Sequence, residues 1–503
     1  MRLGRNLLAG LANSVWTALI GFAVVPIYIK YLGIEAYGVI GFFATTQAVL
    51  SLLDLGLAPA INREVARCSA SGEMKEARNL LSTVSIIYWG MAALIAVAGV
   101  LLAPFVAGHW LQSNALSVET LTHAVMAMSL VVACRWPIGQ YLGALMGMQL
   151  IGQSSLINIF MVTLNSLGAI VILAFVSPTI EAFFLWQTGV AIAYVTLMRA
   201  FAWRAIGTAG VEKFDSKRLK KIWRFSAGMS GIAVSGVILM QLDKVLLSNL
   251  LSLEDFGRYA LAGVVSSGLY VMLTPLFNAI CPRLTALVAA GDSVKLIEMY
   301  RSGTKLFLSA FFPVAVAAAV FSKDILYLWT GNSHLAATAA PIVSLILIGT
   351  MLNGVMHFPY ALLLAYGETR IPLVTNLILI SLMVPLTIYL TTEYGGVGGG
   401  ASWAILNTIY VFVGTYRVHK KLLPQIGRAW LLSDVLLPLA VSVLLTGFGC
   451  ELMAAHYTNI PSHVAAGFVL ALLSFMVSIS INRKISMNEI KNIFVQSFNR
   501  NSK

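Results

Sequence analysis

The chain has 503 residues, of which 59% are hydrophobic and only 11% are charged, and its formal net charge is +13. Soluble globular domains carry about 25% charged residues, so this composition excludes an ordinary soluble enzyme and indicates a membrane protein. The four cysteines are scattered, and they form neither a CxxC pair nor the framework of a disulfide-rich secreted domain.

Apolar runs of about 20 residues follow one another along the chain, and each can cross about 30 Å of hydrocarbon. The first follows Arg2 and Arg5 and is too long for the apolar core of a cleaved signal, so we interpret it as a membrane helix. The sequence therefore predicts an all-α membrane protein with about fourteen transmembrane helices. The predicted limits are 7–29, 37–62, 80–103, 121–146, 154–176, 182–203, 225–250, 259–281, 306–330, 339–366, 372–392, 398–416, 432–454 and 463–482.

Lysine and arginine mark one side of the predicted membrane. If both chain ends are placed inside, the inner segments hold 28 of the 33 Lys and Arg residues. Short loops rich in these residues stay in the cytoplasm, so we expect both termini to be cytoplasmic. This placement explains the positive net charge without a nucleic-acid partner. The longest outer loop, about 104–119, is too short for a catalytic domain, so we do not expect an enzyme.

The two halves of the chain resemble each other weakly at an offset of 219 residues. Glu35 falls on Glu254 and Gly38 falls on Gly257, and both pairs lie in the loop into the second helix of their half. With six spans per half, the two copies have the same orientation. We therefore expect a parallel repeat about an axis along the membrane normal.

This repeat predicts the domain organisation. Helices 1–6 form an N-terminal lobe over 1–210, and helices 7–12 form a C-terminal lobe over 225–421. A basic cytoplasmic linker over 211–224 joins the lobes, and two extra helices with a cytoplasmic tail occupy 422–503. The basic run in the linker, KRLKK at 217–221, has two interpretations: it binds anionic lipid headgroups, or it only anchors the linker inside.

A basic residue two positions before a proline interrupts one apolar run in each half in a similar way. Arg135 precedes Trp136-Pro137, and His357 precedes Phe358-Pro359. A charge at the bilayer centre costs about 2.5–3.5 kcal/mol on insertion scales, and proline removes a backbone donor. Interrupted helices at matching places point to the central site of a transporter. The alternative is a pair of unrelated kinks, with Arg135 paired to a structural carboxylate.

Further charged side chains lie within or at the ends of the predicted spans. The cations are Lys30, Arg63, Lys244 and Arg283, and the carboxylates are Asp54 and Asp243. Such groups normally face a bundle interior or a wet cavity, and a mostly cationic set suits an anion such as phosphate. The carboxylates are candidates for ion coupling or for buried partners of a cation. At the helix ends, Arg63 and Arg283 have the alternative of snorkelling to the interface.

Enzyme and metal motifs are missing from the sequence. There is no GxxxxGK[ST] phosphate loop, no HExxH pair and no GxSxG elbow. We therefore predict no cofactor and no metal site, and we expect movement of a substrate across the membrane.

Three short segments carry a resemblance to a known family. YLG at 31–33 and DLGL at 54–57 resemble the opening of bacterial polysaccharide flippases, and QLDK at 241–244 resembles the start of their second lobe. These flippases belong to the multidrug/oligosaccharidyl-lipid/polysaccharide exporter (MOP) superfamily. The resemblance implies a V-shaped molecule of two lobes around a central cavity.

The resemblance also implies a substrate. It implies that the protein flips undecaprenyl-diphosphate-linked oligosaccharide units across a bacterial inner membrane, for O-antigen or other surface polysaccharide. The implied partners are this lipid-linked glycan, membrane lipids and a polysaccharide polymerase. Arg135, then Lys244 and Arg63, are the first candidates to bind the diphosphate or glycan. Fourteen helices rather than twelve resemble the lipid II flippase branch, so the branch stays open.

Two rival functions remain. A cation-coupled multidrug antiporter of the same superfamily needs carboxylates in its cavity, and the mostly cationic set counts against it. A membrane glycan polymerase or ligase would carry a large periplasmic loop, and the predicted outer loops are short.

Overall fold

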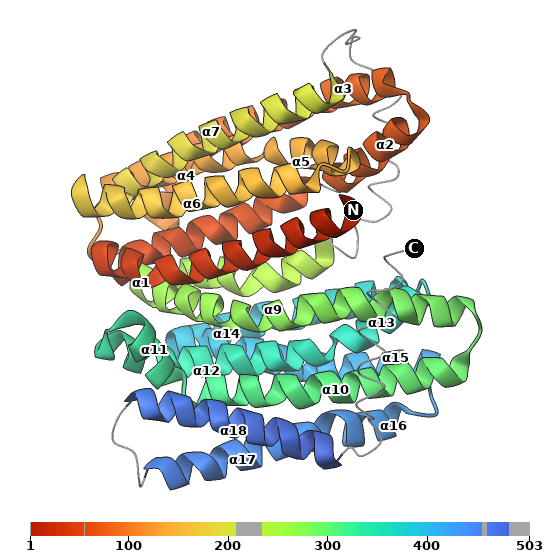
Figure 1. Ribbon diagram of the computed structural model, residues 1–503. Helices are drawn as coiled ribbons and strands as arrows, with labels where there is room; N and C mark the ends of the chain where they lie inside the picture. Colours follow the sequence, from red (N-terminus) through yellow and green to blue (C-terminus); the bar gives the residue numbers. More distant parts are fainter. Residues whose placement is uncertain (1, 55, 208–233, 455–459, 482–503) are drawn as a thin grey trace. The chain divides into compact units, whose positions relative to one another are not determined.

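The computed structural model describes residues 2–54, 56–207, 234–454 and 460–481 (Figure 1). Within these ranges the regular structure is helical, and the β-type pairing consists of one isolated bridge between Gln112 and Ser252. The predicted all-α fold is therefore confirmed. The chain divides into two compact units, Met1–Gly257 and Arg258–Lys503. The predicted linker over 211–224 lies outside the described residues.

The first unit holds the helices that build the candidate site. It also contains a helix over 234–250 and the start of α9 (Leu253–Ala289), which continues into the second unit. Its other elements are α1 (Arg2–Leu50), a 3₁₀ turn (Ser51–Asp54), α2 (Leu57–Ser71), α3 (Met74–Phe105), a π-helical turn (Val106–Trp110), α4 (Val118–Arg135), α5 (Ile138–Gly147), α6 (Ile151–Phe175) and α7 (Ile180–Ile206).

The second unit consists of the rest of α9 and the helices that follow it. They are α10 (Ser293–Val320), α11 (Ser322–Thr330), α12 (Ser333–Val355), α13 (His357–Ala365), α14 (Arg370–Ile409), α15 (Thr415–Leu422), α16 (Gly427–Ala429), α17 (Leu437–Ala454) and α18 (Ile460–Ile481). Two π-helical turns, Tyr410–Gly414 and Trp430–Leu436, interrupt the run from α14 to α17.

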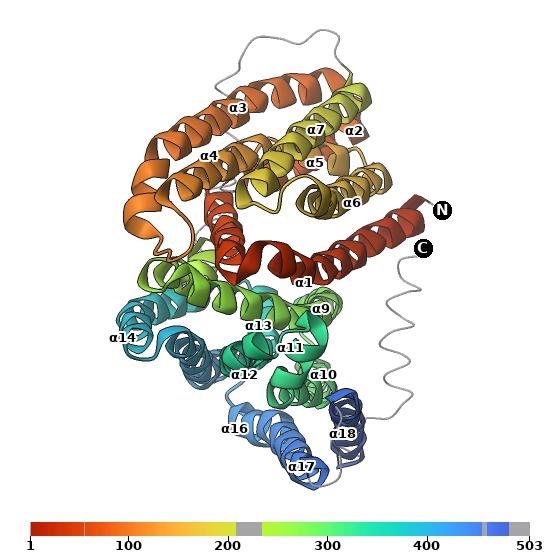
Figure 2. The ribbon, with the colours of Figure 1, turned by 90° about the vertical axis from the view of Figure 1, so that its left-hand side faces the viewer.

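Two of the long helices contain a kink that separates two spans. Gly33 has φ 82° and ψ 167°, which bends α1 where the sequence predicts a loop (Figure 2). Gly395 bends α14 in the same manner. Eleven described helical segments are long and apolar enough to cross a membrane. Counting each kinked segment as two spans and adding the helix over 234–250 gives the fourteen spans predicted from the sequence.

The predicted second span, 37–62, is broken rather than continuous. The α-helix ends at Leu50, the turn Ser51–Asp54 follows, and α2 starts at Leu57 and continues to Ser71. Gly56 adopts a left-handed conformation (φ 78°), and Pro59 lies in the first turn of α2, where a missing N–H is tolerated. Asp54 lies at this break and lines the same cavity as Arg135, which is described below.

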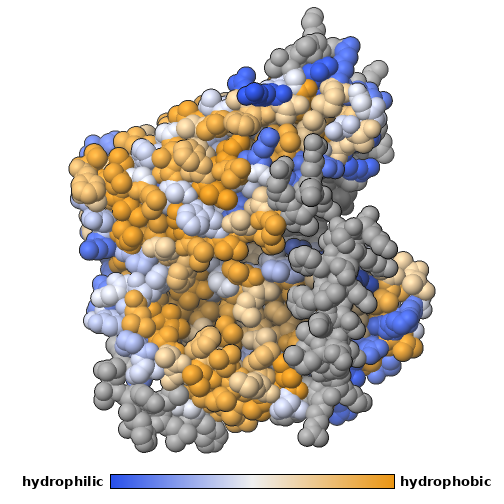
Figure 3. Space-filling model, in the orientation of Figure 1, coloured by the Kyte–Doolittle hydropathy of each residue, from blue (hydrophilic) through white to orange (hydrophobic). Residues whose placement is uncertain are grey.

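The core of the first unit lies among α2, α3, α5 and α7. Ile61, Leu81, Tyr141 and Met198 come from these four helices in that order and are fully buried. Hydrophobic residues cover much of the outer side of this unit, whereas hydrophilic ones gather at the end where α2 meets α3 (Figure 3). This distribution is typical of a membrane-spanning bundle whose basic loops lie at one end.

The loop after α3 ties two distant parts of the first unit together. The carboxylate of Glu35 accepts hydrogen bonds from the Ser113 hydroxyl (2.6 Å) and from the backbone N–H of Asn114 (2.7 Å). The carbonyl of Gln112 accepts from the N–H of Leu253 at 2.7 Å. The start of α9 is thereby held beside the second half of α1.

Candidate functional site

A helix break positions Arg135. α4 ends at Arg135, and α5 begins at Ile138 after Pro137, which cannot donate a backbone hydrogen bond. The second half of the chain repeats this feature, because α12 ends at Val355 and α13 begins at His357. The interruptions predicted at both places are confirmed.

The guanidinium of Arg135 contacts neutral groups. It donates hydrogen bonds to the Oε1 of Gln187 at 2.8 Å and to the Oε1 of Gln47 at 3.5 Å. It also lies 5.6 Å from the ring centroid of Phe43, within the range of a cation–π contact. Among the described residues no carboxylate lies within ion-pair distance of Arg135, so a structural ion pair does not account for its charge. Because these two hydrogen bonds use two of the five N–H donors of the guanidinium, further donors remain for a ligand.

Two cavities of about 340 and 310 Å³ adjoin at Arg135. Arg135, Gln47 and Gly139 line both of them. We call the two together the Arg135 cavity, and its volume falls in the range of small-molecule sites. All of its lining residues belong to the first unit, and it places a positive charge in a half-open, partly polar space.

The larger part of the Arg135 cavity carries amide and hydroxyl groups. Asn158, Asn165 and Tyr194 line it. The Tyr194 hydroxyl donates to the Oδ1 of Asn158 at 2.8 Å, and the Nδ2 of Asn158 donates to the Oδ1 of Asn13 at 2.7 Å. The Oδ1 of Asn165 is buried and accepts no hydrogen bond from the described residues. A buried acceptor without a donor is costly, and a ligand hydroxyl would satisfy it.

The smaller part contains Asp54. Its carboxylate accepts hydrogen bonds from the Tyr88 hydroxyl and from the N–H of Ala58, the latter at 3.2 Å. Asp54 therefore stabilises the start of α2 and also lines the same space as Arg135. Arg135 and Asp54 were predicted separately as candidate site residues, and the structure places both in the lining of one cavity; their roles stay predictions.

The other predicted residues of the first unit lie elsewhere. Lys244 donates to the carbonyl of Met240 at 2.8 Å and lies 3.3 Å from the carboxylate of Asp243. Lys30 and Arg63 are exposed on α1 and α2. None of these four side chains is among the residues that line the Arg135 cavity.

Two predicted residues belong to the second unit. His357 places its Nδ1 3.3 Å from the carbonyl of Asn353 and its ring 5.9 Å from that of Phe277. Arg283 lies half-buried on α9. Their roles as substrate contacts stay predictions.

Sequence reasoning missed the neutral members of the site. We predicted none of the neutral polar residues that contact Arg135 or line its cavity. They are Gln47, Asn158, Asn165, Gln187 and Tyr194. Amides within apolar spans were the available signal, because side-chain amides at that depth need a partner or a wet cavity.

A protein-family model described as "Polysaccharide biosynthesis protein" matches residues 3–288, which is more than half of the chain. The chain belongs to this family. A second model, described as MatE, matches residues 232–389. No curated protein matches it in sequence.

Solved structures share the fold of this chain. An inward closed conformation of the lipid II flippase MurJ superposes with a TM-score of 0.68 at 14% identity, covering 94% of this chain and 98% of that one. An inward-facing multidrug resistance MATE family transporter gives 0.66 at 15%, covering 80% and 95%. A MOP superfamily transporter from Pyrococcus furiosus, described as having a binding pocket of reverse polarity, gives a TM-score of 0.53 at 16% identity, covering 83% of this chain and 95% of that one. The protein therefore has the fold of the MOP superfamily of transporters and flippases.

Proposed function

We propose that the protein flips an undecaprenyl-diphosphate-linked oligosaccharide unit from the cytoplasmic to the periplasmic leaflet of a bacterial inner membrane. The product would feed O-antigen or another surface polysaccharide, through a downstream polymerase. The two lobes would give the site access to each side in turn. The family match supports a role in polysaccharide biosynthesis, and the Arg135 cavity supports an anionic, hydroxyl-rich substrate.

Arg135 is the observation on which this proposal depends most. A guanidinium pairs with phosphate oxygens through two parallel hydrogen bonds, and here it has neutral neighbours instead of a carboxylate. A diphosphate would supply the missing negative charge. Asn158 and Asn165 carry the amide groups that commonly bind sugar hydroxyls, so we assign them to the first sugar of the cargo.

The membrane topology forms part of the proposal. Both termini and the basic segments would face the cytoplasm, where the lipid-linked unit is made. Lys244, Arg63, Arg283, Lys30 and His357 stay candidate contacts, and Asp54 and Asp243 stay candidates for ion coupling. Asp54 ranks first of the two because it lines the Arg135 cavity.

Complementation of a strain that lacks the gene tests the function. Arg135→Ala should abolish surface glycan while the protein is still found in the membrane at the normal level. Arg204→Ala is the matched control, because Arg204 is an exposed arginine on α7 that does not line the cavity. Wild-type glycan in the Arg135→Ala strain would remove the diphosphate role from Arg135.

A cation-coupled drug antiporter is the second candidate, and the MatE match over 232–389 favours it. Such a protein would export cationic compounds, which an unneutralised arginine in the cavity repels. A drug-susceptibility panel on the deletion strain separates the two. Normal surface glycan together with increased sensitivity to cationic drugs would favour the antiporter.

A further inference from the structure

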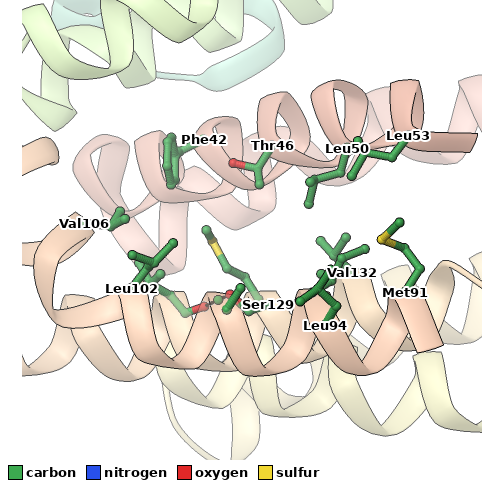
Figure 4. Close-up of a pocket in the computed structure, with 15 residues that line it drawn as sticks. Phe42, Thr46, Leu50, Leu53, Met91, Leu94, Leu102, Val106, Ser129 and Val132 are labelled. Atoms are coloured by element: carbon green, nitrogen blue, oxygen red, sulfur yellow. Dashed lines mark hydrogen bonds between the residues drawn. The ribbon is translucent and has the colours of Figure 1, made fainter. Parts of the chain in front are cut away.

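An apolar groove runs alongside the Arg135 cavity in the first unit. It has a volume of about 330 Å³ and lies between the second half of α1 and the pair α3 and α4. Figure 4 shows Phe42, Thr46 and Leu50 facing side chains such as Leu102 across the gap. Thr46 and Ser129 are the hydroxyl residues of the lining, and the Ser129 hydroxyl is used in a 2.7 Å bond to the carbonyl of Val125.

The spacing of residues on α1 explains how one helix lines both the apolar groove and the Arg135 cavity. Phe42, Thr46 and Leu50 recur every four residues, so they share one face and line the groove. Gln47 and Ser51 follow them by one position, about 100° around the helix, and line the Arg135 cavity. The apolar stripe from position 42 to position 53 is about 16 Å long at 1.5 Å per residue.

The groove and the cavity also meet on α4. Val132 lines both the groove and the smaller part of the Arg135 cavity. Arg135 lies one helical turn beyond Val132 on the same helix. A single amphiphile can therefore place an anionic head at Arg135 and a hydrocarbon chain in the groove.

Hydrocarbon alone would gain little from entering this groove. Lipid tails are as apolar as leucine side chains, so transfer from the bilayer into the groove lacks a hydrophobic driving force. A head group held at Arg135 changes this, because its own chain is then present at a high effective concentration. The expected occupant is consequently the chain attached to the anionic head, rather than any neighbouring lipid.

Building on the proposed function, we propose that the groove holds the head-proximal isoprenoid segment of the lipid-linked cargo while its diphosphate binds Arg135. The chain then travels with the N-terminal lobe instead of staying free in the bilayer. The assignment concerns α1, α3 and α4, and it specifies an isoprenoid diphosphate rather than a phospholipid.

Photo-crosslinking tests the assignment in the full-length protein. The protein is reconstituted in phosphatidylethanolamine and phosphatidylglycerol vesicles with an isoprenoid diphosphate that carries a diazirine on its first isoprene units. Labelled peptides are then identified by mass spectrometry. Labelling should concentrate in 42–53, 91–106 and 125–132, should be competed by unlabelled isoprenoid diphosphate, and should persist with added phospholipid.

Two adjacent leucines provide a matched pair of variants. Leu102 lines the groove and Leu101 does not, although both are exposed on α3. Leu102→Trp fills the groove and should reduce labelling about fivefold or more. Leu101→Trp should stay within about twofold of wild type. Leu94→Trp, also in the lining, is the second filling variant if Leu102→Trp does not fold.

The outcomes distinguish failure of the groove assignment from failure of the proposed function. Specific labelling elsewhere in the protein, or equal labelling of the two variants, overturns the groove assignment and leaves the flippase proposal standing. Labelling that excess phospholipid removes makes the groove an ordinary lipid site and also overturns the assignment. If no peptide is labelled specifically while Arg135→Ala abolishes surface glycan, the groove assignment alone fails. If neither effect is seen, the proposed function fails with it.

Discussion

Gly38 and Gly257 lie against each other where α1 crosses the start of α9, within the first unit. A Cβ added to Gly38 would lie 2.2 Å from the carbonyl oxygen of Leu253, and one added to Gly257 would lie 2.3 Å from that of Ile34. Ile34 and Leu253, like the two glycines, are 219 positions apart. The offset of 219 residues found in the sequence therefore relates both the two glycines and the two carbonyl groups of this contact.

Gly38→Ala should destabilise the protein, because a methyl group here meets the backbone rather than a flexible side chain. Overpacking of this kind costs about 1–3 kcal/mol. Thermal unfolding of the purified protein measures the effect as a lower Tm. Gly21→Ala is the control on the same helix, since its added Cβ meets nothing within 4 Å. Equal Tm values for the two variants would show that the crossing is looser than the structure indicates.

The buried ion pair of Asp434 should contribute more to the free energy of unfolding than ion pairs on the protein surface do. Asp434 is fully buried, and its carboxylate receives Arg301 at 2.7 Å and Lys305 at 3.3 Å. Arg301→Ala leaves this carboxylate with a single cation, so we expect a loss of about 1–3 kcal/mol in the free energy of unfolding. Because Asp434 lies just before α17, the loss should appear as early detachment of the two C-terminal helices in hydrogen exchange.

Lys295→Ala is the control for Arg301→Ala on α10. Lys295 pairs with Asp292 at 2.8 Å, but its side chain is exposed. Surface pairs are screened and contribute little, so no measurable change in Tm is expected. A loss as large as that of Arg301→Ala would contradict the distinction between buried and exposed pairs.

Glu368 should make stability depend on pH at one loop of the second unit. The hydrogen bond from Lys421 lowers the pKa of the Glu368 carboxyl, which lies between two membrane-spanning segments. Since the folded pKa is below the unfolded value of about 4.3, the stabilisation is full above that value. It is lost as the pH falls through the folded pKa.

The Tm of Glu368→Gln, compared with wild type between pH 7 and acid, tests this dependence. The difference in favour of wild type should shrink as the pH falls below about 4.3, and it should be smaller in high salt because Lys421 is exposed. A difference that stays constant with pH would show that the pair does not stabilise the folded state electrostatically.

Whether a residue of the site could be predicted from the sequence depends on whether its side chain is charged. Arg135 and Asp54 were predicted because a charge within an apolar run has few acceptable surroundings, and both line the Arg135 cavity. Gln187 was missed because only charged side chains within the apolar runs were singled out, although a neutral amide at that depth also needs a partner or a wet cavity. Sequence also does not report which way a helix faces. Lys244, whose role as a substrate contact stays a prediction, lies beside its own neighbour Asp243 and is not among the residues that line the Arg135 cavity.

More of the fold than of the site could be predicted from the sequence. Span length and proline placement predicted the fourteen spans and the breaks at Pro137 and His357, because both are local consequences of backbone hydrogen bonding in lipid. The break after Leu50 was missed although Asp54, Gly56 and Pro59 lie just after it, because the leucines between them keep the run apolar enough to be interpreted as one span. The groove on α1 was equally hidden, since its lining has the composition of any lipid-facing surface.

Binding of an isoprenoid diphosphate to the purified protein tests the central claim most directly. Calorimetric titration with a short-chain isoprenoid diphosphate sugar would compare wild type, Arg135→Ala and Arg204→Ala. Hydrogen bonds to charged groups contribute about 1.5–3 kcal/mol each, so Arg135→Ala should weaken binding about tenfold or more while Arg204→Ala binds as wild type does. Equal affinity of Arg135→Ala and wild type would contradict the account.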